Sequence, residues 1–141
     1  DNLEAFSGYQ RNRSALLKTG VEIYEFKPDA KVRQRVMTEH MFKRLPTTPS
    51  FGLHAKTMTI DDHITIVGTY NFDPRSANLN TESFTVIHST EITDGVNIAM
   101  RIEMEPENAW LISEDFNPDH KVSIFKQIGV KLRRIVPKNI L

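Results

Sequence analysis

Residues 54–71 read HAKTMTIDDHITIVGTYN, and this stretch decides the fold because it carries a strand pattern and a dense set of polar side chains. Thr, Ile and Val are enriched on both sides of the polar pair Asp61-Asp62. This enrichment predicts a β-hairpin with one strand over residues 51–60, a second over residues 63–70 and a turn between them.

Four polar side chains are expected at one end of this hairpin. Side chains two residues apart on a strand project to the same face, so His54 and Lys56 share a face. Thr69 and Asn71 repeat this spacing at the end of the second strand, and pairing of the strands is expected to bring all four together. An ammonium, a hydroxyl and an amide can bind phosphate oxygens, and an imidazole can attack phosphorus or transfer a proton. The sequence therefore predicts a phosphate site.

Further helices and strands are predicted on both sides of the hairpin. A helix over residues 7–18 is expected to end near Gly20 and to run into a strand over residues 21–26. A third strand is predicted over residues 82–88, followed by a helix over residues 92–104. The apolar face of that helix would consist of Ile92, Val96, Ala99 and Met100. This order predicts an α/β fold, a mixed β-sheet flanked by helices.

Length and composition limit the classes of protein that need to be considered. A chain of 141 residues with 39% hydrophobic content fits one domain over residues 1–141. Lys plus Arg and Asp plus Glu are both 18, so net charge gives no indication of a polyanionic partner. The absence of cysteine excludes disulfides and zinc-thiolate sites. No apolar run approaches the roughly 18 residues that a membrane-spanning helix needs.

Residues 121–141 form a basic amphipathic tail that has two interpretations. Basic residues are interspersed along it, and no acidic residue occurs after Asp119. Its apolar side chains, which lie roughly on one helical face, are Ile124, Phe125, Ile128, Leu132 and Ile135. Such a helix can lie on an anionic membrane surface, or it can pack its apolar face on the sheet and leave its cations in water.

The spacing within residues 54–71 resembles the HKD motif of the phospholipase D superfamily. His54-x-Lys56 is followed by Asp61 and by Gly68-Thr69-Tyr70-Asn71, with every spacing of the motif kept. The stretches NFDPRS at 71–76 and LNTE at 79–82 are similar to the cardiolipin synthase-like branch.

The resemblance implies a chemistry in which two HKD motifs meet. One motif histidine attacks phosphorus to form a phosphohistidine, the other protonates the leaving alkoxide, and water or an alcohol resolves the intermediate. His54 would be one of the pair, and Lys56, Thr69 and Asn71 would bind the phosphate. Glu82 would accept a hydrogen bond from the far ring nitrogen of the histidine.

The resemblance also implies structural roles and sets aside other kinds of site. Asp61 and Gly68 would be structural members of the motif, and the chemistry requires no metal and no cofactor. The alternative for Glu82 is an ion pair with Arg75, which would carry little energy at the surface.

Only one motif is present in these 141 residues, so a partner is expected. The chain would be the C-terminal HKD half of a bilobal enzyme and a fragment of it, or it would pair with a second copy as a homodimer.

The expected function is cardiolipin synthase-like transfer between phospholipids at a bacterial membrane, with the protein bound peripherally at the inner membrane or its cytoplasmic face. One alternative is a phospholipase D hydrolase. Another is an HKD-type nuclease that uses basic residues in 27–43, although few aromatic side chains are interleaved there for stacking on bases. The third is a noncatalytic scaffold, which the complete set of motif residues disfavours.

Overall fold

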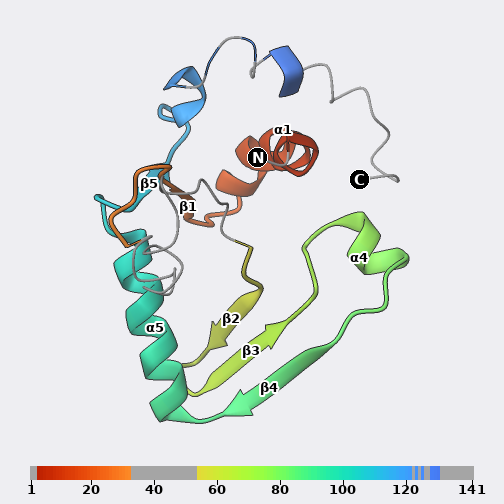
Figure 1. Cartoon of the computed structure of the whole chain (residues 1–141), viewed down its shortest axis with the longest axis vertical. Helices are drawn as coiled ribbons and strands as arrows, with labels where there is room; N and C mark the ends of the chain where they lie inside the picture. Colours follow the sequence, from red (N-terminus) through yellow and green to blue (C-terminus); the bar gives the residue numbers. More distant parts are fainter. Residues whose placement is uncertain (1–2, 33–53, 122, 124, 126–127, 131–141) are drawn as a thin grey trace, which may run out of the picture.

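The computed structural model describes residues 3–32, 54–121, 123, 125 and 128–130. Its elements, in chain order, are α1 (Leu3–Leu17), β1 (Ile23–Phe26), β2 (Thr57–Ile60), β3 (Ile64–Gly68), α4 (Pro74–Asn78), β4 (Phe84–His88), α5 (Thr90–Met104), β5 (Ala109–Ile112) and the 3₁₀ helix η1 (Pro118–Lys121). The described strands form two antiparallel sheets, β1-β5 and β2-β3-β4. Helices flank these sheets, so the predicted α/β class is confirmed (Figure 1).

The predicted hairpin is present as β2 and β3, and its turn explains the choice of residues. Asp61 and Asp62 both have positive φ, 49° and 55°, and the amide of His63 donates to the carbonyl of Ile60 at 3.3 Å. Two consecutive left-handed residues match the right-handed twist of the flanking strands, and aspartate tolerates this conformation better than most residues. The first strand begins at Thr57, and residues 51–53 of its predicted range lie outside the described residues.

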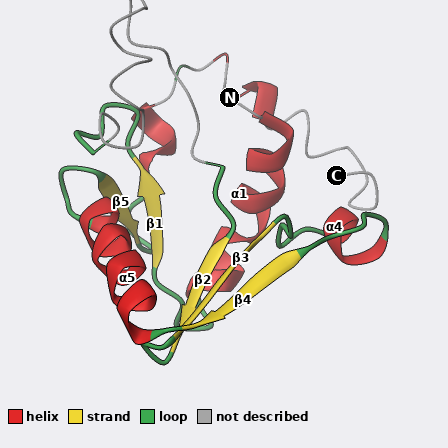
Figure 2. Ribbon diagram, turned by 60° about the horizontal axis from the view of Figure 1, so that its bottom comes forward, coloured by secondary structure: helices red, strands yellow, loops and turns green. Residues whose placement is uncertain are grey.

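Helix α5 contacts both sheets and packs on one face of the three-stranded sheet (Figures 1 and 2). Its N-cap Ser89 accepts a hydrogen bond from the amide of Ile92. The contact with β3 is polar, because the hydroxyls of Thr93 and Thr65 are both buried and lie 2.9 Å apart. The predicted apolar face is therefore partly wrong: Ile92 is 46% exposed and Thr93 is fully buried, since a buried partner hydroxyl satisfies the Thr93 hydroxyl.

The second sheet joins parts of the chain that are far apart in sequence. Strand β1 pairs with β5, with Ile23 opposite Ile112, although the sequence analysis predicted no strand at 109–112. The predicted N-terminal helix is confirmed and begins earlier, at Leu3, and Gly20 with φ 86° closes the turn before the strand. A left-handed residue at this place favours glycine.

A buried arginine links α1 to this second sheet through ion pairs. Arg13 is 7% exposed and forms ion pairs with Glu25 on β1 and with Asp119 in η1. The hydroxyl of Tyr9 also donates to Glu25, and the amide of Gln10 donates to Asp119, both at 2.8 Å. Burial lowers the pKa of Arg13, but the hydrogen bonds that its guanidinium donates to Asp119 and Glu25 outweigh that effect and raise the pKa, so the guanidinium stays charged.

Among the described residues, the side chains on the opposite face of the three-stranded sheet are mostly apolar and partly or largely exposed. Side chains alternate along each strand, so Thr65 faces α5 while Ile64 and Ile66 project from the other face. On that face Met58 is 40% exposed and Phe84 is 65% exposed. Among the described residues, no helix is both long and apolar enough to cross a membrane.

Candidate active site

His54 and Lys56 lie just before β2, at the end of the sheet that also carries α4 (Figure 1). The amide of Gly68 donates to the carbonyl of Lys56 at 3.1 Å, which extends the ladder one residue beyond the Thr57–Val67 pair. The ammonium of Lys56 is hydrogen-bonded to Nε2 of His54, so both side chains lie on one side of the chain, as their spacing predicts. Because an ammonium only donates, Nε2 is the accepting nitrogen in this arrangement.

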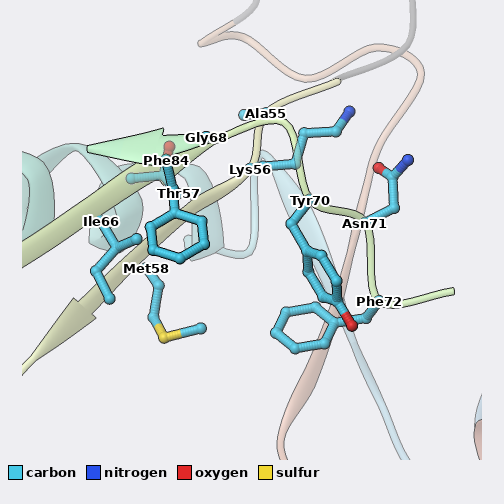
Figure 3. Close-up of a pocket in the computed structure, with 10 residues that line it drawn as sticks. All are labelled: Ala55, Lys56, Thr57, Met58, Ile66, Gly68, Tyr70, Asn71, Phe72 and Phe84. Atoms are coloured by element: carbon cyan, nitrogen blue, oxygen red, sulfur yellow. The ribbon is translucent and has the colours of Figure 1, made fainter. Parts of the chain in front are cut away.

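Lys56 and Asn71 line one groove with a volume of about 570 Å³. Figure 3 shows the ammonium of Lys56 and the amide of Asn71 at one side of the groove, with the ring of Phe84 and the side chain of Met58 away from them. A point charge and a neutral amide donor beside each other are suited to the nonbridging oxygens of a phosphodiester.

Thr69 lies beside Glu82 and is committed to hydrogen bonds within the chain. Its hydroxyl donates to Oε2 of Glu82 at 2.5 Å, and the amide of Ser83 donates to the same hydroxyl oxygen at 3.0 Å. A threonine hydroxyl has one proton, which in this arrangement belongs to the bond with Glu82. The expected role of Thr69 in phosphate binding therefore stays a prediction. In the structure, the Thr69 hydroxyl holds the carboxylate of Glu82.

The register of the hairpin explains why Thr69 faces Glu82. Lys56 lies opposite Gly68, so Thr69 is opposite Ala55, and simple strand alternation would place Thr69 on the face away from Lys56. Strand pairing alone therefore does not place Thr69 beside Lys56, and the expected convergence of the four side chains stays a prediction. Asn71 reaches the groove of Lys56 because β3 ends at Gly68 and the chain leaves the ladder after it.

Asn71 is held by α4, a helix that the sequence analysis did not predict. Asp73 is the N-cap of this helix, and its carboxylate accepts from the amide of Ser76 at 2.7 Å. The hydroxyl of Ser76 in turn accepts from the backbone amide of Asn71 at 3.3 Å. Ser76 is 5% exposed and is a site residue that sequence reasoning missed. The signal was present, since Asp73 followed by Pro74 is a common start of a helix.

Glu82 is the centre of this network. It accepts from the hydroxyl of Thr69 and from the amide of Asn80, the latter at 3.3 Å. Its pKa lies below the ordinary carboxyl value, first because of the Thr69 hydroxyl and next because of the Ser76 hydroxyl, with smaller effects of Asn80 and of the Lys56 charge. Glu82 is therefore a carboxylate at neutral pH, close enough to Lys56 to interact with its charge.

The remaining predicted residues have clear positions. Among the described residues, no ion pair joins Glu82 to Arg75. No hydrogen bond joins Glu82 to His54 in the same part of the chain, so that predicted contact is not formed. Asp61 lies in the hairpin turn, at the opposite end of the sheet from α4. Gly68 lies where β3 and β4 approach closely, and a Cβ atom there would be 2.5 Å from the carbonyl oxygen of Ser83.

The chain is similar to known proteins of one family. The family model of the cardiolipin synthase PLD-like domain matches residues 5–101. Cardiolipin synthase C of Escherichia coli is 32% identical over 148 aligned residues, which cover 93% of this chain and 30% of the relative. The minor cardiolipin synthase ClsB of Bacillus subtilis is 39% identical over 64 residues, which cover 45% of this chain and 16% of the relative.

A further relative shows how much of the longer proteins is matched. An uncharacterized protein of Helicobacter pylori is 29% identical over 160 aligned residues, which cover 100% of this chain and 29% of the relative. The chain thus spans about 30% of the length of the first curated relatives. No solved structure matches the chain significantly. From the match over residues 5–101 and the HKD spacing, this chain belongs to the phospholipase D superfamily, in the family of the cardiolipin synthase PLD-like domain.

Proposed function

We propose that this chain supplies one half of a phospholipase D-type active site that transfers a phosphatidyl group between phospholipids, as a cardiolipin synthase does. The observation that carries the proposal is the position of Lys56, whose ammonium contacts Nε2 of His54 and lines the same groove as Asn71. An imidazole, a cation and an amide donor thereby adjoin one region in which a phosphodiester can bind.

His54 acts as one of two histidines in a two-step displacement. In the first step a histidine nitrogen bonds to phosphorus, the bond between phosphorus and the leaving alkoxide oxygen breaks, and the second histidine gives its proton to that oxygen. In the second step the hydroxyl of the acceptor phospholipid loses its proton to the second histidine and bonds to phosphorus, and the phosphorus–nitrogen bond breaks. Hydrolysis follows the same course with water as the acceptor.

Lys56 and Asn71 bind the nonbridging oxygens in this proposal, and Glu82 supports them. The Lys56 charge offsets the charge that the oxygens carry in the transition state. Asn71 donates through its amide, and its backbone is held by Ser76. In this proposal Glu82 is a positioning residue, which its contacts with Thr69 and Asn80 support.

The second histidine belongs to another HKD half. That half is supplied either by a further lobe of a longer protein or by a second copy of this chain. The coverage of about 30% of the relatives' length supports the first arrangement, because those relatives have ample chain for another lobe.

Peripheral association with an anionic bacterial membrane completes the proposal. Within the predicted apolar face of the 121–141 tail, Phe125 is 88% exposed and Ile128 is 49% exposed. Exposed apolar side chains among cations suit a membrane surface. The rest of that face, Ile124, Leu132 and Ile135, lies outside the described residues.

Nucleic acid is a less suitable substrate class. The nuclease alternative relies on the basic residues of 27–43, of which 33–43 lie outside the described residues. The two lysines that are described have partners in the chain: Lys27 donates to the carbonyl of Pro106, and Lys31 pairs with Glu107 at 2.9 Å. Neither lysine is among the residues that line the groove of Lys56.

The test compares two histidine substitutions in protein that contains this chain joined to a second HKD half. His54→Asn is expected to lower the conversion of phosphatidylglycerol to cardiolipin and glycerol by about 10³-fold or more, because the imidazole takes part in covalent or acid–base chemistry. His88→Asn is the matched control, because His88 is exposed at the far end of β4, and it should retain activity within about twofold. Comparable activity of the two variants would refute the proposed role of His54.

A further inference from the structure

Ser76 is a buried residue of α4 whose hydroxyl is not part of the helix N-cap. It is 5% exposed, so its hydroxyl requires hydrogen-bond partners inside the protein. The N-cap uses the backbone of Ser76, because the carboxylate of Asp73 accepts from its backbone amide at 2.7 Å. An alanine at this position would keep that amide and the cap. The hydroxyl therefore serves the loop before α4 rather than the start of the helix.

The hydroxyl of Ser76 links Asn71 to Glu82, and its partners fix the direction of the two hydrogen bonds. The hydroxyl oxygen accepts from the backbone amide of Asn71 at 3.3 Å. A serine hydroxyl has one proton and a carboxylate only accepts, so the hydrogen bond between Ser76 and Glu82 uses that proton. The carboxylate also accepts from the hydroxyl of Thr69 at 2.5 Å, which holds it from a second side.

Asn71 depends on such bonds because it lies beyond the strand that leads to it. Strand β3 ends at Gly68, so the ladder no longer orders the backbone at Asn71. There the backbone amide bonds to the Ser76 side chain, and the carbonyl accepts from the amide of Asp73 at 2.8 Å. Ordering a loop backbone costs conformational entropy, which these bonds offset. Loss of the Ser76 bond would therefore widen the range of positions that Asn71 occupies.

The position of Asn71 matters for turnover because its side-chain amide lines the groove beside Lys56 (Figure 3). In the proposed function this amide donates to a nonbridging phosphate oxygen. A donor of this kind stabilises the transition state only when it is already held in place, and a misplacement of about 1 Å can cost about 10²-fold in rate. A residue that holds Asn71 can therefore change the rate without touching the substrate.

We propose that Ser76 is a positioning residue whose hydroxyl fixes the place from which the Asn71 amide reaches the phosphate. The inference rests on the proposed function and deepens it, because it names a residue outside the HKD spacing that controls phosphate binding. Ser76 is not among the residues that line the groove, so its effect on turnover passes through Asn71. Glu82 completes the link, since it takes the hydroxyl proton and leaves the oxygen lone pairs for Asn71.

The experiment is a double-mutant cycle in protein that contains this chain joined to a second HKD half. Ser76→Ala is expected to lower kcat for the conversion of phosphatidylglycerol to cardiolipin and glycerol by about 10- to 100-fold. Asn71→Ala, which removes the donor itself, should lower kcat by about 10²- to 10³-fold. In the Asn71→Ala background, Ser76→Ala should lower kcat by no more than about twofold further, because no amide remains to be positioned.

Ser89→Ala is the matched control for lost stability. The Ser89 hydroxyl accepts from the amide of Ile92 as the N-cap of α5, so alanine there removes a buried or half-buried serine bond and destabilises a helix. Ser89 follows β4 at the end of the sheet away from α4 (Figure 1). Its substitution should leave kcat within about twofold of the unaltered protein, since it touches none of the groove residues.

A spectroscopic readout tests the positioning without any turnover. In the NMR spectrum of the full 141-residue chain, the backbone amide proton of Asn71 should shift upfield in Ser76→Ala, because it loses its hydrogen bond to the hydroxyl. The amide proton of Thr69 is an internal reference, because it bonds to the backbone carbonyl of Ser83 at 2.9 Å. Ser89→Ala should leave the Asn71 resonance where it is in the unaltered chain.

Three results would overturn the inference. The first is a Ser76→Ala loss of kcat that persists in full in the Asn71→Ala background, which would show that Ser76 acts elsewhere. The second is an equal loss of kcat in Ser89→Ala, which would assign the effect to stability. The third is an Asn71 amide resonance that Ser76→Ala does not move.

Failure of this inference and failure of the proposed function are distinguishable. Loss of turnover in His54→Asn with full turnover in Ser76→Ala would leave the chemistry standing and remove the positioning role. An upfield shift of the Asn71 amide in Ser76→Ala, with turnover unchanged in His54→Asn, would keep the Ser76 contact and refute the proposed function.

Discussion

At the scale of single residues, Glu82 connects more parts of the site than its place in the motif suggests. Its carboxylate accepts from Thr69, and the hydrogen bond with Ser76 also lowers its pKa. Ser76 holds the backbone amide of Asn71, so one carboxylate connects the end of β3 with the residue that lines the groove. We infer that Glu82 acts through its neighbours as a positioning residue.

Glu82→Gln is expected to destabilise the chain in a pH-dependent manner. The folded-state pKa of Glu82 is lowered from 4.5, so its contribution is complete above that pH and is lost as pH falls through the lowered pKa. The difference in melting temperature between the unaltered chain and Glu82→Gln should therefore be largest at neutral pH and should shrink in acid. Thermal unfolding followed by circular dichroism at several pH values measures it.

The control for this prediction is Glu114→Gln. Glu114 is an exposed acid outside the network, so its substitution should leave the melting temperature nearly unchanged at every pH. A Glu82→Gln effect of the same size at neutral and acid pH would contradict the role assigned to the carboxylate.

At the scale of elements, the approach of β3 to β4 at Gly68 sets the geometry of the site end of the sheet. A Cβ atom at Gly68 would lie 2.5 Å from the carbonyl oxygen of Ser83 and 2.6 Å from Cβ of Phe84. The same strand end leads directly to Thr69 and on to Asn71. A larger residue at this point would therefore move both the hydrogen-bond network and the groove.

Gly68→Ala is expected to destabilise the chain by about 1–3 kcal/mol, because overpacking against backbone forces the strands apart. Gly95→Ala provides a control for which the change in the free energy of unfolding should have the opposite sign. Gly95 lies within α5, where a Cβ atom would meet nothing within 4 Å, and alanine should stabilise the helix by about 0.5–1 kcal/mol. Urea unfolding of both variants measures the two changes, and equal signs would contradict the close approach at Gly68.

At the scale of the whole molecule, the described residues bury few apolar side chains. The buried apolar residues among them are Ala30, Ala109, Ile112 and Val130. Buried polar contacts, such as Arg13 with Glu25 and Asp119, hold α1 to the β1-β5 sheet. Apolar side chains of the β2-β3-β4 sheet, such as Met58 and Phe84, are in contrast exposed.

The isolated chain is expected to show little turnover on phospholipids and on a chromogenic phosphodiester, because its 141 residues hold one HKD motif and the mechanism needs two histidines. If two copies combine instead, the rate should rise with the square of the chain concentration when dimers are scarce. The assay is a concentration series of the isolated chain. Activity proportional to concentration at low concentration would rule out the need for a partner.

The sequence by itself indicated the family and determined the local folding units. The spacing of His54 and Lys56 placed their side chains together, and the pair Asp61-Asp62 specified a turn. These features depend on residues that are close along the chain, where strand periodicity and turn preferences act. The hairpin and the helices α1 and α5 were predicted for the same reason.

Only the tertiary structure decided the partners of the site residues. Thr69 bonds to Glu82, Asn71 reaches the groove of Lys56 through the end of β3, and β5 pairs with β1. Each of these contacts joins segments whose meeting depends on strand register and on packing across the fold. Local sequence patterns do not specify these long-range contacts, because the free energy of such contacts comes from groups that are distant in sequence.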